Sequence, residues 1–337
     1  MKTAILLLNV GSPDAPTVPA VRRYLTQFLN DKRVIDLPWL LRKFLVNAII
    51  IPFRVKNSTK LYLRLWTKKG SPLIYLTEEL REKLEQKQKK GDKVFAAMRY
   101  GNPGIKKALK AIKSEGFERV ILVPLFPQHA MSTTETSVFA AEKKIKKLGI
   151  KAKVLSIEQF YDHPKFIDSF VKQAQKYDVS KYDHVIFSYH GLPNRHIEKC
   201  HPGIKLTDCS CTSSLPEHGK KCYRATSYAT SRLLAKELNL SAGDYTVSYQ
   251  SRLSKNWLTP FTDLTLDEKL KEGKKKILVL APSFVTDCLE TTLEIGVEYG
   301  DEFYKNGGEK LQLVESLNAE DHWVDALNQI IKDQTNA

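Results

Sequence analysis

Long uninterrupted apolar runs are missing from this sequence of 337 residues. The most apolar stretch, residues 34–53, is broken by charged residues and prolines, which excludes a membrane-spanning helix. No apolar segment with a small-residue cleavage site opens the sequence, so we expect a cytoplasmic protein. Residues 34–53 can still lie on a membrane surface, and contact with the inner face of a membrane is the accompanying expectation.

Signatures of nucleotide and nucleic-acid binding are also lacking. The loop at Gly11 does not have GxGxxG spacing, which removes support for a dinucleotide or triphosphate site. The formal net charge is +15, but no basic segment interleaves stacking aromatics, so we expect no nucleic-acid partner. Most lysines lie in helix-like segments as solvated faces. The remaining excess charge favours anionic lipid headgroups or carboxylate-bearing substrates.

What is present is a regular alternation of short apolar runs with longer amphipathic segments. This alternation is typical of parallel sheets covered by helices, so the fold class is α/β. The expected strands are Ala4–Val10, Lys93–Met98, Arg119–Pro124, Lys153–Ile157, His184–Ser188, Tyr245–Gln250, Lys276–Ala281 and Gln312–Val314. The expected helices include Pro19–Leu29, Thr77–Gln88, Ile105–Glu115, Lys165–Lys176, Thr226–Glu237 and Cys288–Tyr299. Eight strands favour two sheets of four, with a boundary near residue 160.

His190 is the first candidate for chemistry. It follows the apolar run 184–188 and precedes Gly191 and Pro193, which favour a turn. Functional groups gather at the carboxyl ends of parallel strands, so an imidazole is expected at the mouth of a strand. Histidine there can accept a proton near neutral pH or bind a transition metal. The structural alternative is a histidine that only stabilises a tight turn.

A row of carboxylates forms the second candidate. Asp287, Glu290, Glu294 and Glu298 follow an apolar strand at steps of three and four, which places them on one helical face. Asp287 and Glu290 also fit a helix-capping pair. Capping does not account for Glu294 and Glu298, because like charges four residues apart repel each other.

Clustered cysteines are the third signal. Of five cysteines, four lie in one short segment, at Cys200, Cys209, Cys211 and Cys222. Structural disulfides are disfavoured in a cytoplasmic protein, so four thiolates around one metal centre is the preferred interpretation. The spacing lacks the C-x2-C knuckles typical of structural zinc and favours a [2Fe-2S] cluster. A zinc site that includes nearby histidines is the alternative.

Seven sequence blocks, in order, resemble the ferrochelatases. They are LNVGSPDAP at 8–16, GSPL at 70–73, MRYGNP at 98–103, PLFPQ at 124–128, FSYHGLP at 187–193, YQSR at 249–252 with Trp257, and DCLETTLE at 287–294. The resemblance is to the bacterial type, here with an internal four-cysteine segment. It implies insertion of Fe²⁺ into protoporphyrin IX, the terminal step of haem biosynthesis.

The resemblance implies two Rossmann-like, chelatase-type domains with the active-site cleft between them. We expect residues 1–159, with an apolar lip near 34–53, and residues 160–337, with a cysteine-bearing insertion at 196–224. His190 and Glu290 correspond to the metal-handling pair of the family, supported by Asp287 and Glu294. The implied substrate-binding residues are Arg99, as the partner of a propionate, and Tyr100, Trp257 and Val10. Ordinary core packing is the alternative for the two aromatic residues.

Two other functions are compatible with the same scaffold. A related chelatase would act on another tetrapyrrole, such as coproporphyrin, or would insert cobalt. A non-catalytic haem or metal carrier would use the same cleft. The acidic row distinguishes the carrier from the enzymes, because a carrier needs no carboxylates that move protons.

Overall fold

The computed structural model describes residues 2–335, which form two compact units. The first unit takes the described residues of Met1–Phe126, Met131–Gln159 and Ala319–Ala337. The second takes Pro127–Ala130 and Phe160–Asn318. Gln159 ends the second segment of the first unit and Phe160 begins the longer segment of the second, and the expected domain boundary at 159 and 160 stays a prediction. The expected second domain differs at its end, because the last helix packs with the first unit.

The sheet of the first unit is parallel, with the strand order β2-β1-β3-β4. Its strands are β1 (Thr3–Asn9), β2 (Lys93–Met98), β3 (Arg119–Pro124) and β4 (Lys153–Ser156). All seven residues of β1 are buried, because helices cover both faces of a central parallel strand. Continuous apolar sequence is therefore the expected signature of this strand.

Alternate residues of these strands face different helices. Leu6, Leu8 and Leu122 pack in one core with Leu109 and Ile145, which belong to α5 (Ile105–Ser114) and α6 (Thr136–Leu148). On α4 (Pro72–Gln86), Lys83 pairs with Asp321 at 2.7 Å and so links α4 to α12 (Asp321–Thr335). The first unit is thus completed by the last helix of the chain.

Residues 34–53, expected as an apolar lip, are mostly helical. The helices around them are α1 (Val18–Leu29), α2 (Trp39–Phe44), a π-helix η1 (Leu45–Ile50) and α3 (Ile51–Leu65). Val46 and Ile51 pack beneath, against α1. Large apolar side chains remain on the surface, and Phe53 is 80% exposed. Within residues 2–335, no helix combines the length and apolar character needed to cross a membrane.

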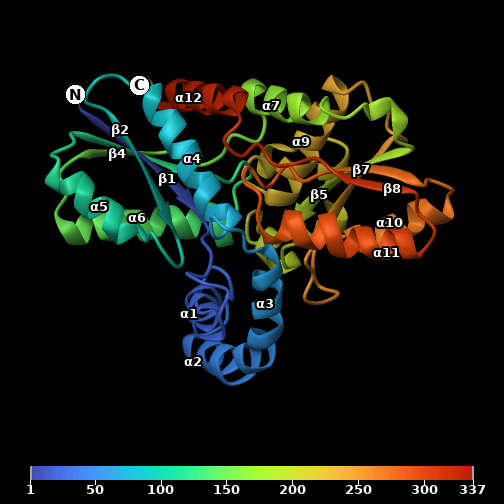
Figure 1. Ribbon diagram of the computed structural model, residues 1–337, viewed down its shortest axis with the longest axis horizontal. Coiled ribbons are helices and arrows are strands. Elements are labelled where there is room, and N and C mark those ends of the chain that lie inside the picture. Colours follow the sequence, from blue (N-terminus) through green and yellow to red (C-terminus); the bar gives the residue numbers. More distant parts are fainter. Residues whose placement is uncertain (1, 336–337) are drawn as a thin grey trace. The chain divides into compact units, whose positions relative to one another are not determined.

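The second unit has a parallel sheet of the same pattern, β6-β5-β7-β8. Its strands are β5 (His184–His190), β6 (Tyr245–Gln250), β7 (Lys276–Leu280) and β8 (Lys310–Leu313). Its longer helices are α7 (Pro164–Ala174), α9 (Tyr223–Glu237), α10 (Thr262–Lys271), a π-helix η7 (Glu290–Tyr299) and α11 (Gly300–Lys305). In Figure 1, α7 and α9 lie on one side of this sheet and α10 and α11 on the other. The predicted α/β class with two four-stranded parallel sheets is confirmed.

Short helices make up most of the remaining chain. They are η2 (Met131–Glu135), η3 (Val179–Lys181), α8 (Asn194–Glu198), η4 (Leu206–Asp208), η5 (Ser210–Thr212) and η6 (Glu217–Gly219). The last three lie in the cysteine-bearing segment, and α8 leads into it. Brief helical turns separated by loops are what a segment without apolar periodicity is expected to form.

Candidate active site

His190 lies at the carboxyl end of a strand, as predicted. It is the last residue of β5, and its side chain is half-buried. The His190 ring meets the ring of Phe284 edge-on, with centroids 6.2 Å apart. The Tyr223 hydroxyl bonds to the His190 backbone, and burial raises the pKa of Tyr223 above its usual range. The imidazole therefore lies at the carboxyl end of β5, at the edge of the second unit's sheet where its strands end.

The turn after His190 is held against the neighbouring strand. The Gly191 backbone N–H donates to the Gln250 carbonyl oxygen at 2.8 Å. A Cβ atom at Gly191 would lie 2.7 Å from that oxygen and 3.3 Å from the Trp257 ring. Pro193 forms an isolated bridge with Trp257. The structure therefore brings Trp257 and the His190 turn together.

Glu290 opens the π-helix η7, and its side chain is half-buried. The helix expected over Cys288–Tyr299 is present at residues 290–299, where the chain adopts the wider π-helical turn. Residues four apart still share a face in either helix, so Glu290 and Glu294 remain neighbours. π-Helical turns are rare and occur often at functional sites. The Glu290 carbonyl oxygen accepts a hydrogen bond from Gln250 Nε2 at 3.0 Å.

The half-buried Glu294 carboxyl group has two hydroxyl donors. Ser251 Oγ donates to one oxygen and the Tyr299 hydroxyl to the other, the latter at 2.8 Å. Burial raises the pKa of Glu294, with a smaller contribution from the charge of Glu290, while the two hydroxyls act in the opposite direction. A carboxyl group with a raised pKa can hold a proton closer to neutral pH.

Asp287 is fully occupied by structural contacts. Its carboxylate accepts from Asn318 Nδ2 at 2.7 Å, from the Ser316 backbone N–H at 3.1 Å and from Thr291 Oγ1 at 3.2 Å. These bonds attach the start of the acidic helix to the segment after β8. The N-cap of η7 is Leu289, without a side-chain cap bond, so the capping pair expected of Asp287 and Glu290 is not formed; Asp287 instead anchors the segment before the helix.

Replacing Glu294 with glutamine tests its raised pKa through stability. Because the folded-state pKa lies above the usual value of 4.5, Glu294 contributes stability below pH 4.5 that is lost as pH rises through the folded-state pKa. Glutamine is neutral at every pH. The free energy of unfolding of Glu294→Gln, relative to that of the wild type, should therefore increase as pH rises. Urea titrations at about pH 5 and pH 8 measure the difference.

Glu298→Gln is the matched control, because Glu298 is on the same helix but exposed. Its unfolding free energy should follow the wild type at both pH values. The same pH response in all three proteins would contradict the raised pKa.

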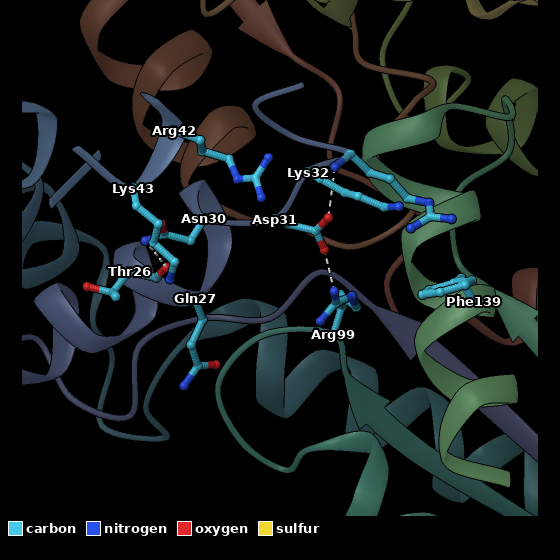
Figure 2. Close-up of a pocket in the computed structure, with 10 residues that line it drawn as sticks. Thr26, Gln27, Asn30, Asp31, Lys32, Arg42, Lys43, Arg99 and Phe139 are labelled. Carbon is cyan, nitrogen blue, oxygen red and sulfur yellow. Dashed lines mark hydrogen bonds and ion pairs between the residues drawn. The ribbon is translucent and has the colours of Figure 1, made fainter. Parts of the chain in front are cut away.

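In the first unit, Arg99 lies in a network around Asp31 (Figure 2). Its guanidinium pairs with Asp31 Oδ2 and donates from Nε to Thr136 Oγ1 at 2.9 Å. Burial by itself would raise the pKa of Asp31, but the Thr136 hydroxyl, a backbone N–H and Arg99 together hold it below its usual value. Arg99 is thus committed to an internal ion pair in this structure.

Tyr100 and Val10 belong to the packing beneath the apolar lip. Tyr100 is 1% exposed, and its hydroxyl donates to Asp31 at 3.0 Å. Val10 packs against the same cluster and accepts the Tyr100 backbone N–H. This arrangement favours the core-packing alternative for Tyr100.

A cavity of about 490 Å³ opens beside Arg99 within the first unit. Figure 2 shows the side chains that line it. They are Thr26, Gln27, Asn30, Asp31, Lys32, Arg33, Arg42, Lys43, Arg99 and Phe139. Five of these residues are cationic and one is acidic, so the cavity favours anionic groups. Sequence reasoning missed Asp31, whose signal was only a polar turn after an amphipathic helix.

The four clustered cysteines do not form the predicted ligand set. Cys200 is exposed, while Cys209, Cys211 and Cys222 are buried. Burial and the neighbouring thiols raise the pKa of Cys211 to about 12, against a weaker opposing effect of Arg224. Within residues 2–335, no three or more His, Cys, Asp or Glu side chains are arranged to hold a metal ion. This arrangement therefore does not show the four-thiolate centre, which stays a prediction.

Known proteins resemble this chain over nearly its whole length. A family model described as Ferrochelatase matches residues 2–335. A ferrochelatase of Coxiella burnetii (strain Dugway 5J108-111) is 42% identical over 340 residues, covering 98% of this chain and 93% of that protein. A ferrochelatase of Pseudomonas putida (strain W619) is 40% identical over 329 residues, covering 96% and 97%.

Solved structures support the fold independently. SirB from Bacillus subtilis with Fe³⁺ aligns with 100% of this chain and 97% of its own, with a TM-score of 0.57 at 10% identity. Such low identity carries information about the fold alone. The family model and the curated relatives span nearly the whole sequence, and by that measure the chain belongs to the ferrochelatase family.

Proposed function

We propose that this ferrochelatase, a lyase that inserts Fe²⁺ into protoporphyrin IX in haem biosynthesis, uses His190 and Glu290 to handle the metal and the displaced protons. The observation that carries the proposal is that His190 lies at the end of one strand and Glu290 comes after the end of the neighbouring strand of the same sheet. His190 ends β5, Glu290 follows β7, and β5 pairs with β7. The carboxyl ends of such strands are where functional groups gather.

The reaction explains why two different groups are needed. Two pyrrole N–H protons must leave as the ferrous ion enters, and a flat ring presents its nitrogen lone pairs poorly to the ion. A site that grips a bent ring binds the transition state better than the substrate. A neutral imidazole can accept a proton or bind iron, and a carboxylate can attract the cation or take a proton. Glu294, whose pKa is raised, supplies a second proton acceptor behind Glu290.

Trp257 and Arg99 are the residues that we propose for contact with the porphyrin. Trp257 is half-buried beside the His190 turn, which suits a ring that stacks on the macrocycle. Arg99 lines the basic cavity and would have to share its guanidinium between Asp31 and a propionate. Asp287 supports the helix that carries Glu290, and Tyr100 and Val10 support the fold around Arg99.

An insertion assay with Fe²⁺ and protoporphyrin IX tests these roles through substitutions of His190 and Glu290. The same assay with coproporphyrin or with Co²⁺ tests the alternative of a chelatase for another ring or metal. A carrier without catalysis is the second alternative. It is disfavoured by the paired Glu290 and Glu294, because binding alone does not require them.

The cysteine-bearing segment is proposed to hold a metal centre, with [2Fe-2S] preferred to zinc. Three of its four thiols are buried, and Cys209 Sγ lies 3.4 Å from His218 Nε2. In the described arrangement Cys200 is exposed and bonds to a backbone oxygen at 3.6 Å, so it would have to turn inward. Iron insertion by His190 and Glu290 does not require this centre.

Cys211→Ser tests the centre by colour and metal content. Protein purified without oxygen should be red-brown and contain iron, and Cys211→Ser should lose most of both, because a hydroxyl is a poor ligand for iron–sulfur clusters. Cys288→Ser, a buried cysteine of the acidic segment, should keep them. Absorption spectra and metal analysis give the result. Colourless zinc protein would support the zinc alternative, and metal-free protein would contradict both.

The apolar lip at residues 34–53 is proposed to rest on an anionic membrane surface. Leu40 is 73% exposed and Phe53 is 80% exposed. Lys43 and Arg54 are exposed on the same helices. Exposed apolar side chains flanked by cations are the combination that binds an interface.

Replacing Leu40 and Phe53 together with serine tests the lip. Each side chain contributes about 1.5–3 kcal/mol when fully buried, so the double variant should bind anionic vesicles at least about tenfold more weakly. Co-sedimentation with vesicles of anionic phospholipid measures the binding. Leu253→Ser, an exposed leucine of the second unit, is the control. Equal binding by both variants would contradict a role for the lip.

A further inference from the structure

Gln250 makes three hydrogen bonds that meet at the proposed site. It is the last residue of β6 and is 1% exposed. Its carbonyl oxygen accepts from the Gly191 backbone N–H at 2.8 Å. Its side-chain Oε1 accepts from Ser188 Oγ at 2.7 Å, and its Nε2 donates to the Glu290 carbonyl oxygen at 3.0 Å.

The three partners of Gln250 surround the two residues assigned to the metal. Ser188 lies two residues before His190 on β5, Gly191 directly follows His190, and Glu290 is bound at its own carbonyl. We infer that Gln250 is a positioning residue that fixes the separation between the imidazole of His190 and the carboxylate of Glu290. This inference rests on the proposed roles of those two residues.

The contacts require an amide at this position. Oε1 must accept and Nε2 must donate, so one side chain has to offer both groups, which glutamine does. A glutamate would place a negatively charged oxygen against the Glu290 carbonyl. A methionine would leave the Ser188 hydroxyl and that carbonyl without Gln250 as a partner, and buried polar groups that lose a partner are costly.

The hydrogen bonds of Gln250 to Ser188, Gly191 and Glu290 form a brace, and the next residue extends this brace along the π-helix. Ser251 has φ 63°, a left-handed conformation that is uncommon for serine. In this conformation its hydroxyl donates to Glu294, one turn beyond Glu290. Two consecutive residues thus contact the first two turns of η7. Ser188 also bonds to Thr262, at 2.9 Å, which fixes the far end of the brace.

Gln250→Glu and Gln250→Met are the variants that test the inference. A misplacement of about 1 Å between reacting groups can cost about 100-fold in rate. We expect kcat for Fe²⁺ insertion to fall at least about tenfold in both variants, with KM for protoporphyrin changed less than about twofold, because the brace orients the metal groups and does not bind the ring.

Ser248→Ala is the matched control. Ser248 is buried in the same polar network through Thr262, at 2.9 Å, but no bond joins it to Glu290 among the described contacts. Its kcat should stay within about twofold of the wild type. Amide hydrogen exchange gives a second readout that does not depend on activity. Residues 290–294 should exchange faster in the Gln250 variants and at the wild-type rate in Ser248→Ala.

Each result decides a separate claim. Wild-type kcat and exchange in either folded Gln250 variant would overturn the inference, as would an equal loss of kcat in Ser248→Ala. His190→Ala and Glu290→Gln are assayed alongside. If those two keep the wild-type rate, the proposed function of the residues fails whatever Gln250 does. If they lose activity and the Gln250 variants do not, only the role of Gln250 fails.

Discussion

His190→Ala should lower kcat for Fe²⁺ insertion by about 10²–10⁴-fold, the usual contribution of a positioned acid or base. The imidazole stands at the end of β5 with its ring against Phe284, and alanine removes the only group of that residue that can accept a proton or bind iron. Protoporphyrin should still bind, because the ring contacts come from other residues. The loss of free porphyrin fluorescence under anaerobic conditions measures the rate.

A histidine of the same strand provides the control. His184 begins β5, where its Nε2 contacts Thr246 at 2.9 Å, and burial lowers its pKa to about 4. It is therefore neutral at assay pH and lies at the opposite end of the strand from His190. The folded fraction of His184→Gln should keep most of the wild-type activity. Turnover by His190→Ala at the wild-type rate would remove His190 from the mechanism.

Glu290→Gln should reduce kcat by about 10²-fold or more while the fold is retained. Glutamine keeps the size of the side chain and removes the charge that attracts the ferrous ion and the site that takes a proton. The Glu290 backbone oxygen still accepts from Gln250, so the helix start is unchanged. Initial rates over a range of Fe²⁺ concentrations separate weaker metal capture, seen in KM, from slower insertion, seen in kcat.

Glu298→Gln is again the appropriate comparison, since it removes one negative charge from the exposed side of the same helix. Its rate should remain within about twofold of the wild type. If Glu290→Gln and Glu298→Gln were equally active, general charge on η7 and not the carboxylate of Glu290 would explain the acidic row.

The strands were predictable because parallel strands are buried on both faces and therefore need nearly continuous apolar sequence. Thr3–Asn9 and His184–His190 both meet this condition. The location of His190 followed from the same rule. Applied to the sixth strand, the rule would also have singled out Gln250, which ends β6.

Other features had no local signal. A spacing of four fits an α-helix and a π-helix equally, so the type of η7 could not be read from Glu290 and Glu294. The partner of Arg99 is Asp31, 68 residues away in sequence, and only the folded chain brings the two together. Close spacing of cysteines likewise did not determine which thiols face one another, and Cys200 points to the surface.

The sequence of α12 also did not determine which of the two units this helix packs against. Its apolar face, with Trp323 and Leu327 fully buried, predicts a helix but not the sheet that it covers. The structure places it on α4, where Lys87 pairs with Asp325 at 2.8 Å.

This placement has a consequence for how the protein is made. The ribosome synthesises residues 160–318, most of the second unit, before it reaches α12, which packs on α4. During translation of residues 160–318, the surface of the first unit that α12 later covers therefore stays uncovered. For the same reason no single proteolytic cut can liberate either half intact.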